Sequence, residues 1–199
     1  MAFHSGLIGL SYQQESVSKS EPFTQRLATE GKLPTNANGF AMVFTRTSRN
    51  STTEASGYDG IQAGGVFEAG EFDTDSYTGS INFIDVPSEV QQEGSWAIPL
   101  DAISIAGQSG SLNGAIAYID SGTSLLYMPS SVNRGIYSRI SGARQLTGNM
   151  AGYYSIPCDG VNAQLGFTFN GQTYMVNDQD LNAGALDTSG STCLGGIGE

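Results

Sequence analysis

The chain has 199 residues, enough for one domain with a sizeable core, and carries 19 acidic residues against 8 basic ones. Its formal net charge of -11 at pH 7 argues against nucleic acid and anionic membrane surfaces as partners. No apolar run is long enough to span a membrane, and no signal peptide is visible in this chain. The 27 glycines, with frequent Ser and Thr, predict many short strands joined by tight turns.

The first third of the chain alternates short apolar runs with polar loops. Residues 6–10 predict an apolar strand, and residues 39–44 predict a buried one. Residues 20–30 predict a helix, because Pro22 suits a first helical turn. The polar loop that follows residue 44 holds the only N-glycosylation sequon, at Asn50.

From residue 64 onward the pattern becomes one of repeated short strands. A second helix is predicted for residues 130–140, after Pro129, and Asn170–Gly171 is typical of a two-residue hairpin turn. The chain is therefore predicted to be mainly β with two or three short helices. The predicted strands of this part cover residues 64–70, 76–86, 95–107, 114–122, 153–158, 163–169 and 172–176.

Neither the cysteines nor the acidic turns suggest a metal site. Cys158 and Cys193 are too few and too far apart for a zinc framework, which leaves a structural disulfide, the preferred interpretation, or two buried thiols. A disulfide here would stabilise the fold by about 4 kcal/mol on the chain-entropy account. The acidic group of Glu71, Asp73 and Asp75 lacks the spacing of an EF-hand loop, so we expect a solvated turn, no metal and no cofactor.

An apolar strand that ends in a carboxylate is the strongest chemical signal in the sequence. Residues 115–119 lead into Asp120, and the chain turns at Ser121–Gly122 before apolar sequence resumes. We expect such a carboxylate to be partly desolvated, which raises its pKa, while the glycine permits close approach of a backbone N–H or a ligand. These are requirements for a carboxylate that activates water. The alternative is an ordinary Asp-Ser-Gly turn, which is commoner for the tripeptide alone.

The longer segment around Asp120, IAYIDSGTSLLYMP, resembles the second active-site loop of the pepsin-like aspartic proteases. Residues 64–81, 96–107 and 152–158 agree with that family in order and spacing, and residues 6–10 resemble the strand that closes its N-terminal lobe. The resemblance implies an all-β fold, the distorted β-barrel lobe of a pepsin-like acid protease with a few short helices. It also implies a disulfide between the two cysteines.

The resemblance further divides the chain and assigns its site. Residues 1–15 would be the closing-strand remnant of the N-terminal lobe, and residues 16–199 the C-terminal lobe, incomplete at its C-terminus. Asp120 would be one of two catalytic aspartates. We expect the first aspartate and the flap tyrosine upstream of Met1, and no strand after Cys193 to enclose Asp120. The residues expected to support the active-site loop are Ser121, Gly122, Thr123 and Ser124.

No second Asp-Thr-Gly or Asp-Ser-Gly occurs in the chain. Neither Asp59–Gly60 nor Asp187–Thr188 follows an apolar strand, so neither matches the pattern at Asp120. The family uses two carboxylates that share a proton to activate water and hydrolyse peptide bonds. The implied partners are therefore a polypeptide substrate and the missing N-terminal lobe, and this chain alone is expected to be inactive. Should an unrecognised second acid exist, the candidates are Asp73, Asp101 and Asp187.

Two other functions remain open. One is a one-lobe enzyme that dimerises so that Asp120 meets its symmetry mate, and the other is a non-catalytic peptide-binding or inhibitory relative. A Ser-His-Asp mechanism is disfavoured because His4, the only histidine, lies near the chain end and is expected on the surface. The acidic balance and the expected disulfide suit a secreted protein or one of an acidic vacuolar or lysosomal compartment.

Overall fold

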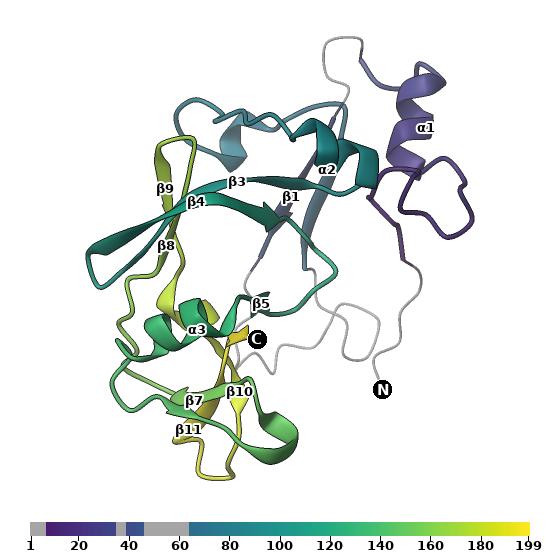
Figure 1. Ribbon diagram of the computed structural model, residues 1–199. Helices are drawn as coiled ribbons and strands as arrows, with labels where there is room; N and C mark the ends of the chain where they lie inside the picture. Colours follow the sequence, from purple (N-terminus) through teal and green to yellow (C-terminus); the bar gives the residue numbers. More distant parts are fainter. Residues whose placement is uncertain (1–6, 35–38, 46–63) are drawn as a thin grey trace. The chain divides into compact units, whose positions relative to one another are not determined.

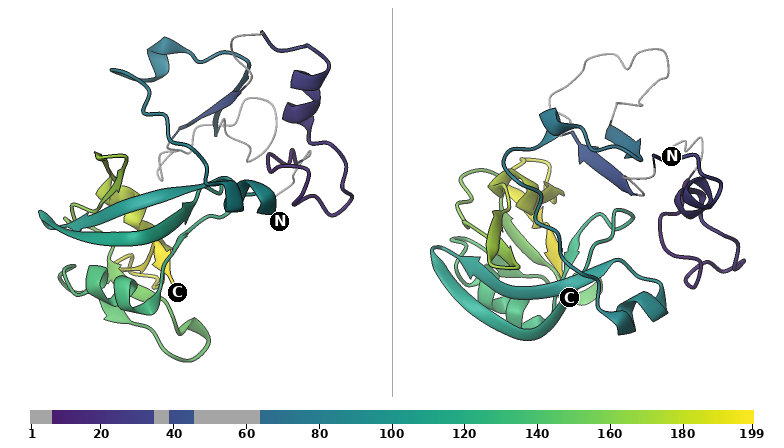
Figure 2. Two further views of the ribbon diagram at one scale, coloured as in Figure 1. Left: turned by 45° about the horizontal axis from the view of Figure 1, so that its top comes forward. Right: turned by 90° about the horizontal axis from the view of Figure 1, so that it is seen from above.

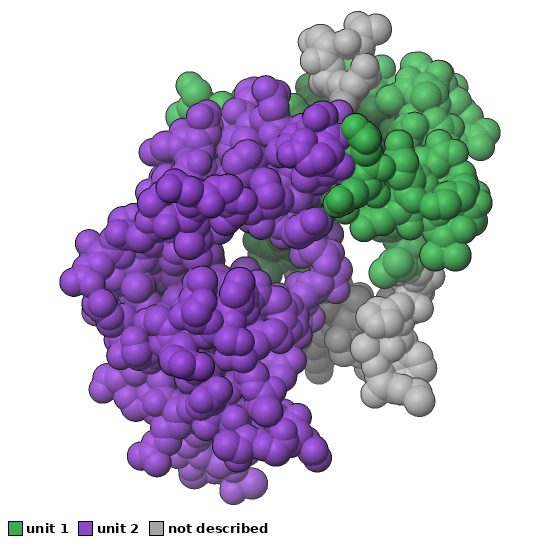
Figure 3. Space-filling view, viewed as in Figure 1, with its two compact units in different colours: residues 1–81, 92–95 green, residues 82–91, 96–199 purple. Residues whose placement is uncertain are grey.

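The computed structural model describes residues 7–34, 39–45 and 64–199, which form two compact units (Figure 3). Unit 1 comprises residues 1–81 and 92–95, and unit 2 comprises residues 82–91 and 96–199. Short strands dominate the described residues and the helices are brief (Figure 1), which confirms the predicted all-β class. Asn50, His4 and Asp59–Gly60 lie outside the described residues.

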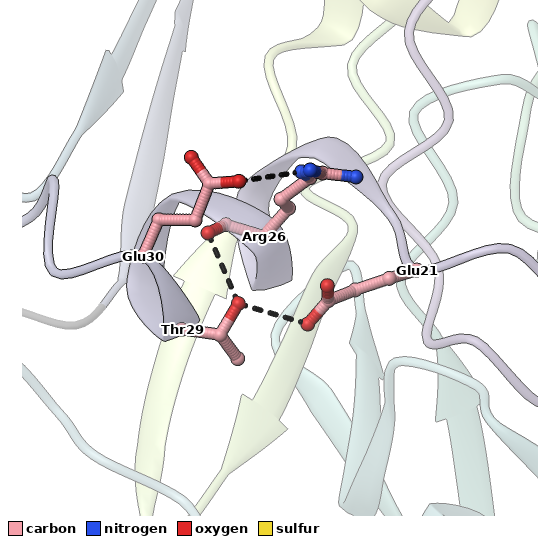
Figure 4. Close-up of polar contacts among 4 residues, drawn as sticks. All are labelled: Glu21, Arg26, Thr29 and Glu30. Carbon is pink, nitrogen blue, oxygen red and sulfur yellow. Dashed lines mark hydrogen bonds and ion pairs between the residues drawn. The ribbon is translucent and has the colours of Figure 1, made fainter.

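Helix α1 (Phe23–Thr29) belongs to unit 1 and confirms the first predicted helix within narrower bounds. Pro22 precedes it in an extended conformation. Arg26 Nε donates to Glu30 Oε1 at 2.8 Å, and Thr29 Oγ1 donates to Glu21 Oε1 at 3.1 Å (Figure 4). The helix buries no residue, and an exposed pair of this spacing contributes only about 0.3–0.5 kcal/mol.

Strands β1 (Phe40–Phe44) and β2 (Gly65–Ala69) of unit 1 pair antiparallel and confirm two predicted strands. The rings of Phe40 and Phe67 stack with centroids 5.8 Å apart. Gly65 has φ 151°, and a Cβ there would lie 2.0 Å from the carbonyl oxygen of Val43, so the pairing requires glycine. After β2, the carboxylate of Asp73 accepts from the backbone N–H of Asp75 and caps the short 3₁₀ helix η1 (Thr74–Ser76).

Two predicted strands are wrong. The described part of the first, residues 7–10, and the whole of the second, residues 76–86, belong to no strand of the structure. Leu7 is 95% exposed and Phe83 is 74% exposed. Apolar composition alone does not make a strand, because its backbone N–H and C=O groups need a neighbouring chain. Gly79, with φ 80°, also interrupts an extended path through the second segment.

Unit 2 contains two four-stranded sheets and one short parallel pair (Figures 1 and 2). The first sheet, in the order β4-β3-β8-β9, consists of β3 (Ala97–Ile105), β4 (Gln108–Tyr118), β8 (Gly166–Phe169) and β9 (Gln172–Met175). The second, in the order β10-β11-β7-β6, consists of β6 (Arg144–Gln145), β7 (Tyr154–Pro157), β10 (Asn182–Ala185) and β11 (Thr192–Gly195).

The sheets of unit 2 stay open, so the predicted barrel does not close. A barrel requires the first and last strands of a sheet to pair, whereas β4 and β9 each pair on one side only. The predicted strands at 95–107, 114–122, 153–158, 163–169 and 172–176 are confirmed with altered ends. Asn170 and Gly171 both have positive φ, 47° and 75°, as a two-residue hairpin between β8 and β9 requires.

The remaining elements of unit 2 are short. Strand β5 (Leu126–Tyr127) pairs in parallel with β12 (Ile197–Gly198). A strand after Cys193 therefore does pair beside the loop that follows Asp120, and that part of the prediction is wrong. Helix α3 (Ser130–Tyr137) confirms the second predicted helix. The others are the 3₁₀ helices η2 (Gly148–Met150) and η3 (Asp178–Leu181), and helix α2 (Ser88–Glu93), whose residues are shared between the units.

The core of unit 2 lies where α3 packs against β7, β11 and β12. The rings of Tyr137 and Tyr154 stack with centroids 4.2 Å apart. The Tyr137 hydroxyl donates to the backbone oxygen of Ile197 at 2.9 Å and accepts from its N–H at 3.1 Å. Burial raises the pKa of Tyr137 to about 12. The buried members of this core are Ile136, Tyr137, Ile140, Tyr154, Ile156, Ala163, Leu165, Leu181, Cys193 and Ile197.

Cys158 and Cys193 form a disulfide, with Cα atoms 4.9 Å apart. This confirms the prediction and excludes the alternative of free thiols. The bond joins β11 to the residue that follows β7, and the N–H of Cys158 also donates to the Ser191 oxygen at 3.2 Å. The disulfide thus links β7 and β11, the two neighbouring strands of the second sheet that border the core.

Candidate active site

Asp120 follows β4, the longest strand among the residues that the structure describes. β4 ends at Tyr118, opposite Ala97 of β3. The N–H of Ile119 donates to the oxygen of Trp96 at 2.7 Å, which continues the hairpin by one step. Asp120 comes next, so it lies at a strand end, as predicted, and its backbone position is set by the β3–β4 ladder.

The loop that follows Asp120 folds back onto its carboxylate. The N–H of Gly122 donates to Oδ1 at 2.8 Å, and the hydroxyl of Thr123 donates to Oδ2. A Cβ on Gly122 would lie 3.2 Å from Oδ1, closer than an ordinary contact. Glycine therefore allows the backbone to approach the carboxylate, as the sequence suggested, while the supporting roles of Ser121 and Ser124 stay predictions.

The electrostatic state of Asp120 differs from the prediction. Its pKa lies below the ordinary value because the Thr123 hydroxyl, and then the Gly122 N–H, stabilise the charged form. The side chain is exposed, so desolvation opposes this only weakly. The predicted partial burial with a raised pKa is therefore wrong for this chain by itself. The two donors thus keep Asp120 ionised, the form that can accept a proton and cannot donate one.

Apolar side chains flank the Asp120 loop and are left open to solvent. Tyr118 and Ile119 precede the aspartate and are 61% and 54% exposed, and Tyr127 of β5 follows the loop and is 53% exposed. The hydroxyls of Tyr127 and Tyr153 lie 3.2 Å apart, and this contact raises the pKa of Tyr127. Exposed apolar side chains thus both precede and follow the carboxylate along the chain.

The other candidate acids serve local structure. Asp73 caps η1, as described above, and Asp101 Oδ2 accepts from the N–H of Gly171 at 3.0 Å. Asp187 accepts hydrogen bonds from Thr192, Ser189 and Ser191, which hold its pKa well below the usual range. Each of the three carboxylates stabilises a turn.

Within the part of the chain that the structure describes, no group of three or more His, Cys, Asp and Glu side chains could hold a metal ion. Over the same residues, no helix has the length and apolar character needed to cross a membrane.

Sequence reasoning missed the tyrosine contacts near the site. The Tyr127–Tyr153 pair joins residues 26 positions apart, and the bond between Tyr137 and Ile197 joins residues 60 apart. No local pattern connects such positions.

Comparison with known sequences identifies the class of protein. A family model described as "Eukaryotic aspartyl protease" matches residues 1–199, and the chain belongs to this family. It is 33% identical over 201 residues to major aspartyl peptidase 1 of Cryptococcus neoformans var. grubii, a match covering 96% of this chain and 39% of that protein.

Two further relatives also match this chain over part of their own length. Penicillopepsin-1 of Penicillium janthinellum is 35% identical over 136 residues, which cover 68% of this chain and 40% of that protein. Pepsin A of Canis lupus familiaris is 28% identical over 172 residues, which cover 85% and 39%. The chain thus spans about two fifths of the length of these relatives.

Proposed function

We propose that this chain supplies one of the two catalytic aspartates of an aspartic-type endopeptidase, and that Asp120 is that residue. The observation that carries the proposal is the geometry of the carboxylate: it follows a strand end, and each of its oxygens accepts a hydrogen bond from the loop behind it. Membership of the aspartyl protease family supports the same assignment. The substrate class is polypeptide.

The proposed mechanism assigns different roles to the two carboxylates. Two carboxylates within hydrogen-bonding distance share one proton, so one acts as base toward water while the other acts as acid toward the scissile carbonyl. Thr123 and Gly122 hold Asp120 in its charged form, which fits the base. The acid would come from an N-terminal lobe, with residues 1–15 as its closing-strand remnant and residues 16–199 as the C-terminal lobe.

Such a lobe would also account for the exposed apolar side chains before and after the Asp120 loop. Once Tyr118, Ile119 and Tyr127 are covered, Asp120 would lose water and its pKa would rise toward the value of a shared pair. The 199-residue chain without that lobe should therefore be inactive, because one carboxylate cannot fill both roles.

The test compares the 199-residue chain with a longer chain that carries the N-terminal lobe. We expect the short chain not to cleave an unfolded protein at acidic pH, and the longer chain to cleave it. Asp120→Asn in the longer chain should abolish cleavage, with Asp101→Asn as a control carboxylate that should leave it active. Loss of activity only in the second variant would overturn the assignment.

The same experiment separates the two other functions. A one-lobe homodimer would give activity in the short chain with a specific activity that rises with protein concentration. A binding or inhibitory relative would be inactive in both lengths and would still retain a peptide ligand.

We also propose a secreted or acidic vacuolar or lysosomal location. The disulfide supports an oxidising compartment, and the low number of cations limits self-repulsion when carboxylates protonate in acid. Asn50 would then be open to glycosylation. A shift in electrophoretic mobility on treatment with an N-glycosidase, absent in Asn50→Gln, tests this, and protein recovered only from the cytosol would contradict it.

A further inference from the structure

The sequence contains three Asn-Gly dipeptides, at Asn38, Asn113 and Asn170. In such a pair, the backbone nitrogen of glycine can attack the asparagine side chain with little steric hindrance, because glycine carries no Cβ. Asn38 lies outside the described residues. The other two asparagines are exposed and belong to unit 2, one in β4 and one in the turn between β8 and β9.

In the pair Asn170–Gly171, both nitrogens that take part in the reaction donate hydrogen bonds. The side-chain nitrogen of Asn170 donates to Asn82 Oδ1 at 3.1 Å, and Asn82 in turn donates to the oxygen of Phe169 at 3.0 Å. The backbone N–H of Gly171 donates to Asp101 Oδ2 at 3.0 Å. A negative charge at that N–H opposes the loss of its proton, which the attack requires.

The pair Asn113–Gly114 has a different environment. The register of the β3–β4 ladder shifts between Leu100 and Ala102, and the pair lies in the irregular part of β4 opposite this shift. Gly114 has φ 76°. The hydroxyl of Ser111 donates to Asn113 Oδ1 at 3.0 Å. This bond draws electron density from the side-chain carbon that would be attacked.

From this contrast we propose that Asn113 is a site of spontaneous deamidation and isoaspartate formation in the folded protein, whereas Asn170 is protected. The nitrogen of Gly114 forms a bond to Asn113 Cγ and gives its proton to solvent. The Cγ–Nδ2 bond breaks as Nδ2 takes up a proton from solvent and leaves as ammonia. Water then opens the cyclic imide at either carbonyl, which yields aspartate or isoaspartate.

The reaction needs only water and becomes faster as pH rises, because the attacking nitrogen must lose its proton. An acidic compartment would therefore slow it, and neutral conditions would permit it. Isoaspartate adds one carbon to the backbone of β4, the strand that leads to Asp120. The modification would thus change the spacing of the strand that positions the candidate catalytic residue.

The test uses the 199-residue chain, incubated at mildly alkaline pH in the folded state and in denaturant. Peptides released by an acidic digest are quantified by mass spectrometry, and isoaspartate is labelled enzymatically with a methyltransferase. In denaturant, both sites should convert at similar rates. In the folded chain, Asn113 should keep much of its unfolded rate, whereas Asn170 should be slower by roughly 10- to 150-fold, the range that hydrogen bonds to charged groups imply.

Two variants test the cause of the protection. Asp101→Asn removes the charge at Gly171 with little change of shape, and Asn82→Ala frees the side-chain nitrogen of Asn170. Each should raise the folded-state rate at Asn170 and leave Asn113 unchanged. Equal folded-state rates at the two sites in the unmodified chain would overturn the proposal without any variant, as would faster conversion at Asn170.

Discussion

Replacement of Tyr137 by Phe removes one buried hydroxyl and keeps the aromatic ring. That hydroxyl is bonded to both the oxygen and the N–H of Ile197, a residue with no exposed surface. The variant leaves both backbone groups without this partner in the core. Because a buried group that loses its hydrogen bond costs about 1–3 kcal/mol, we expect a loss of roughly 2–4 kcal/mol in the free energy of unfolding. The corresponding fall in melting temperature is roughly 5–15 °C for a chain of this size.

The pH dependence of stability tests the contribution of Tyr137 in a second, independent way. The pKa of Tyr137 is about 12 in the folded chain, against an ordinary tyrosine value of 10.0. Between these values the unfolded chain loses the phenolic proton while the folded chain keeps it, so stability falls as pH rises from 10 to 12. Below pH 10 the phenol is neutral in both states and contributes no such slope.

The assay is urea unfolding of wild type and Tyr137→Phe at neutral pH and across the alkaline range, followed by circular dichroism. The difference between the two proteins should be largest at neutral pH and should shrink above pH 10. Tyr174→Phe, at an exposed tyrosine of β9, keeps the contacts of Tyr137 with Tyr154 and Ile197 and is the control, so it should keep the alkaline fall in stability that Tyr137 causes. Equal stability of Tyr137→Phe and wild type at neutral pH would refute the argument.

Four further predictions concern the loops and glycines. Thr123→Val should raise the pKa of Asp120, measured by NMR titration, because it removes the first donor to the charged form; an unchanged pKa would show that Gly122 suffices. Asp187→Asn should destabilise the chain above about pH 4, and its difference from wild type should shrink as pH falls below that, since the carboxylate contributes stability only while it is charged in the folded state. A difference in unfolding midpoint that grows in acid would contradict this. Gly195→Ala should destabilise by about 1–3 kcal/mol, because its Cβ would lie 2.1 Å from a buried tyrosine hydroxyl. Gly135→Ala, in helix α3 with nothing within 4 Å of its Cβ, should stabilise by about 0.5–1 kcal/mol in the same urea unfolding assay.

The parts of the fold that sequence predicted are those set by neighbouring residues. The hairpin at Asn170–Gly171 follows from two residues that tolerate positive φ, and helix α3 begins directly after Pro129, the signal that the sequence offered. Residues 7–10 and 76–86 failed because a strand depends on a partner that local composition does not reveal.

Sequence likewise predicted the candidate site only in part. The strand, the turn and the glycine beside Asp120 could be recognised from sequence, and the structure brings Gly122 and Thr123 onto its carboxylate. The direction in which the pKa of Asp120 shifts could not be predicted from sequence, because it depends on how much water reaches the side chain. The predicted raised value assumed burial, and in this chain the hydrogen bonds outweigh desolvation.

The glycines near the end of the described chain determine how this part of unit 2 assembles. A Cβ at Gly195, Gly196 or Gly198 would lie within 3 Å of a tyrosine ring or hydroxyl or a backbone oxygen already in place. The segment therefore fits beside α3 and η3 only as bare backbone, and a side chain at these positions would have to displace an element that is already packed. Its contacts join residues about 60 positions apart, and such non-local contacts slow folding. The disulfide at Cys193, two residues before the first of these glycines, shortens that search by tethering the segment beside β7.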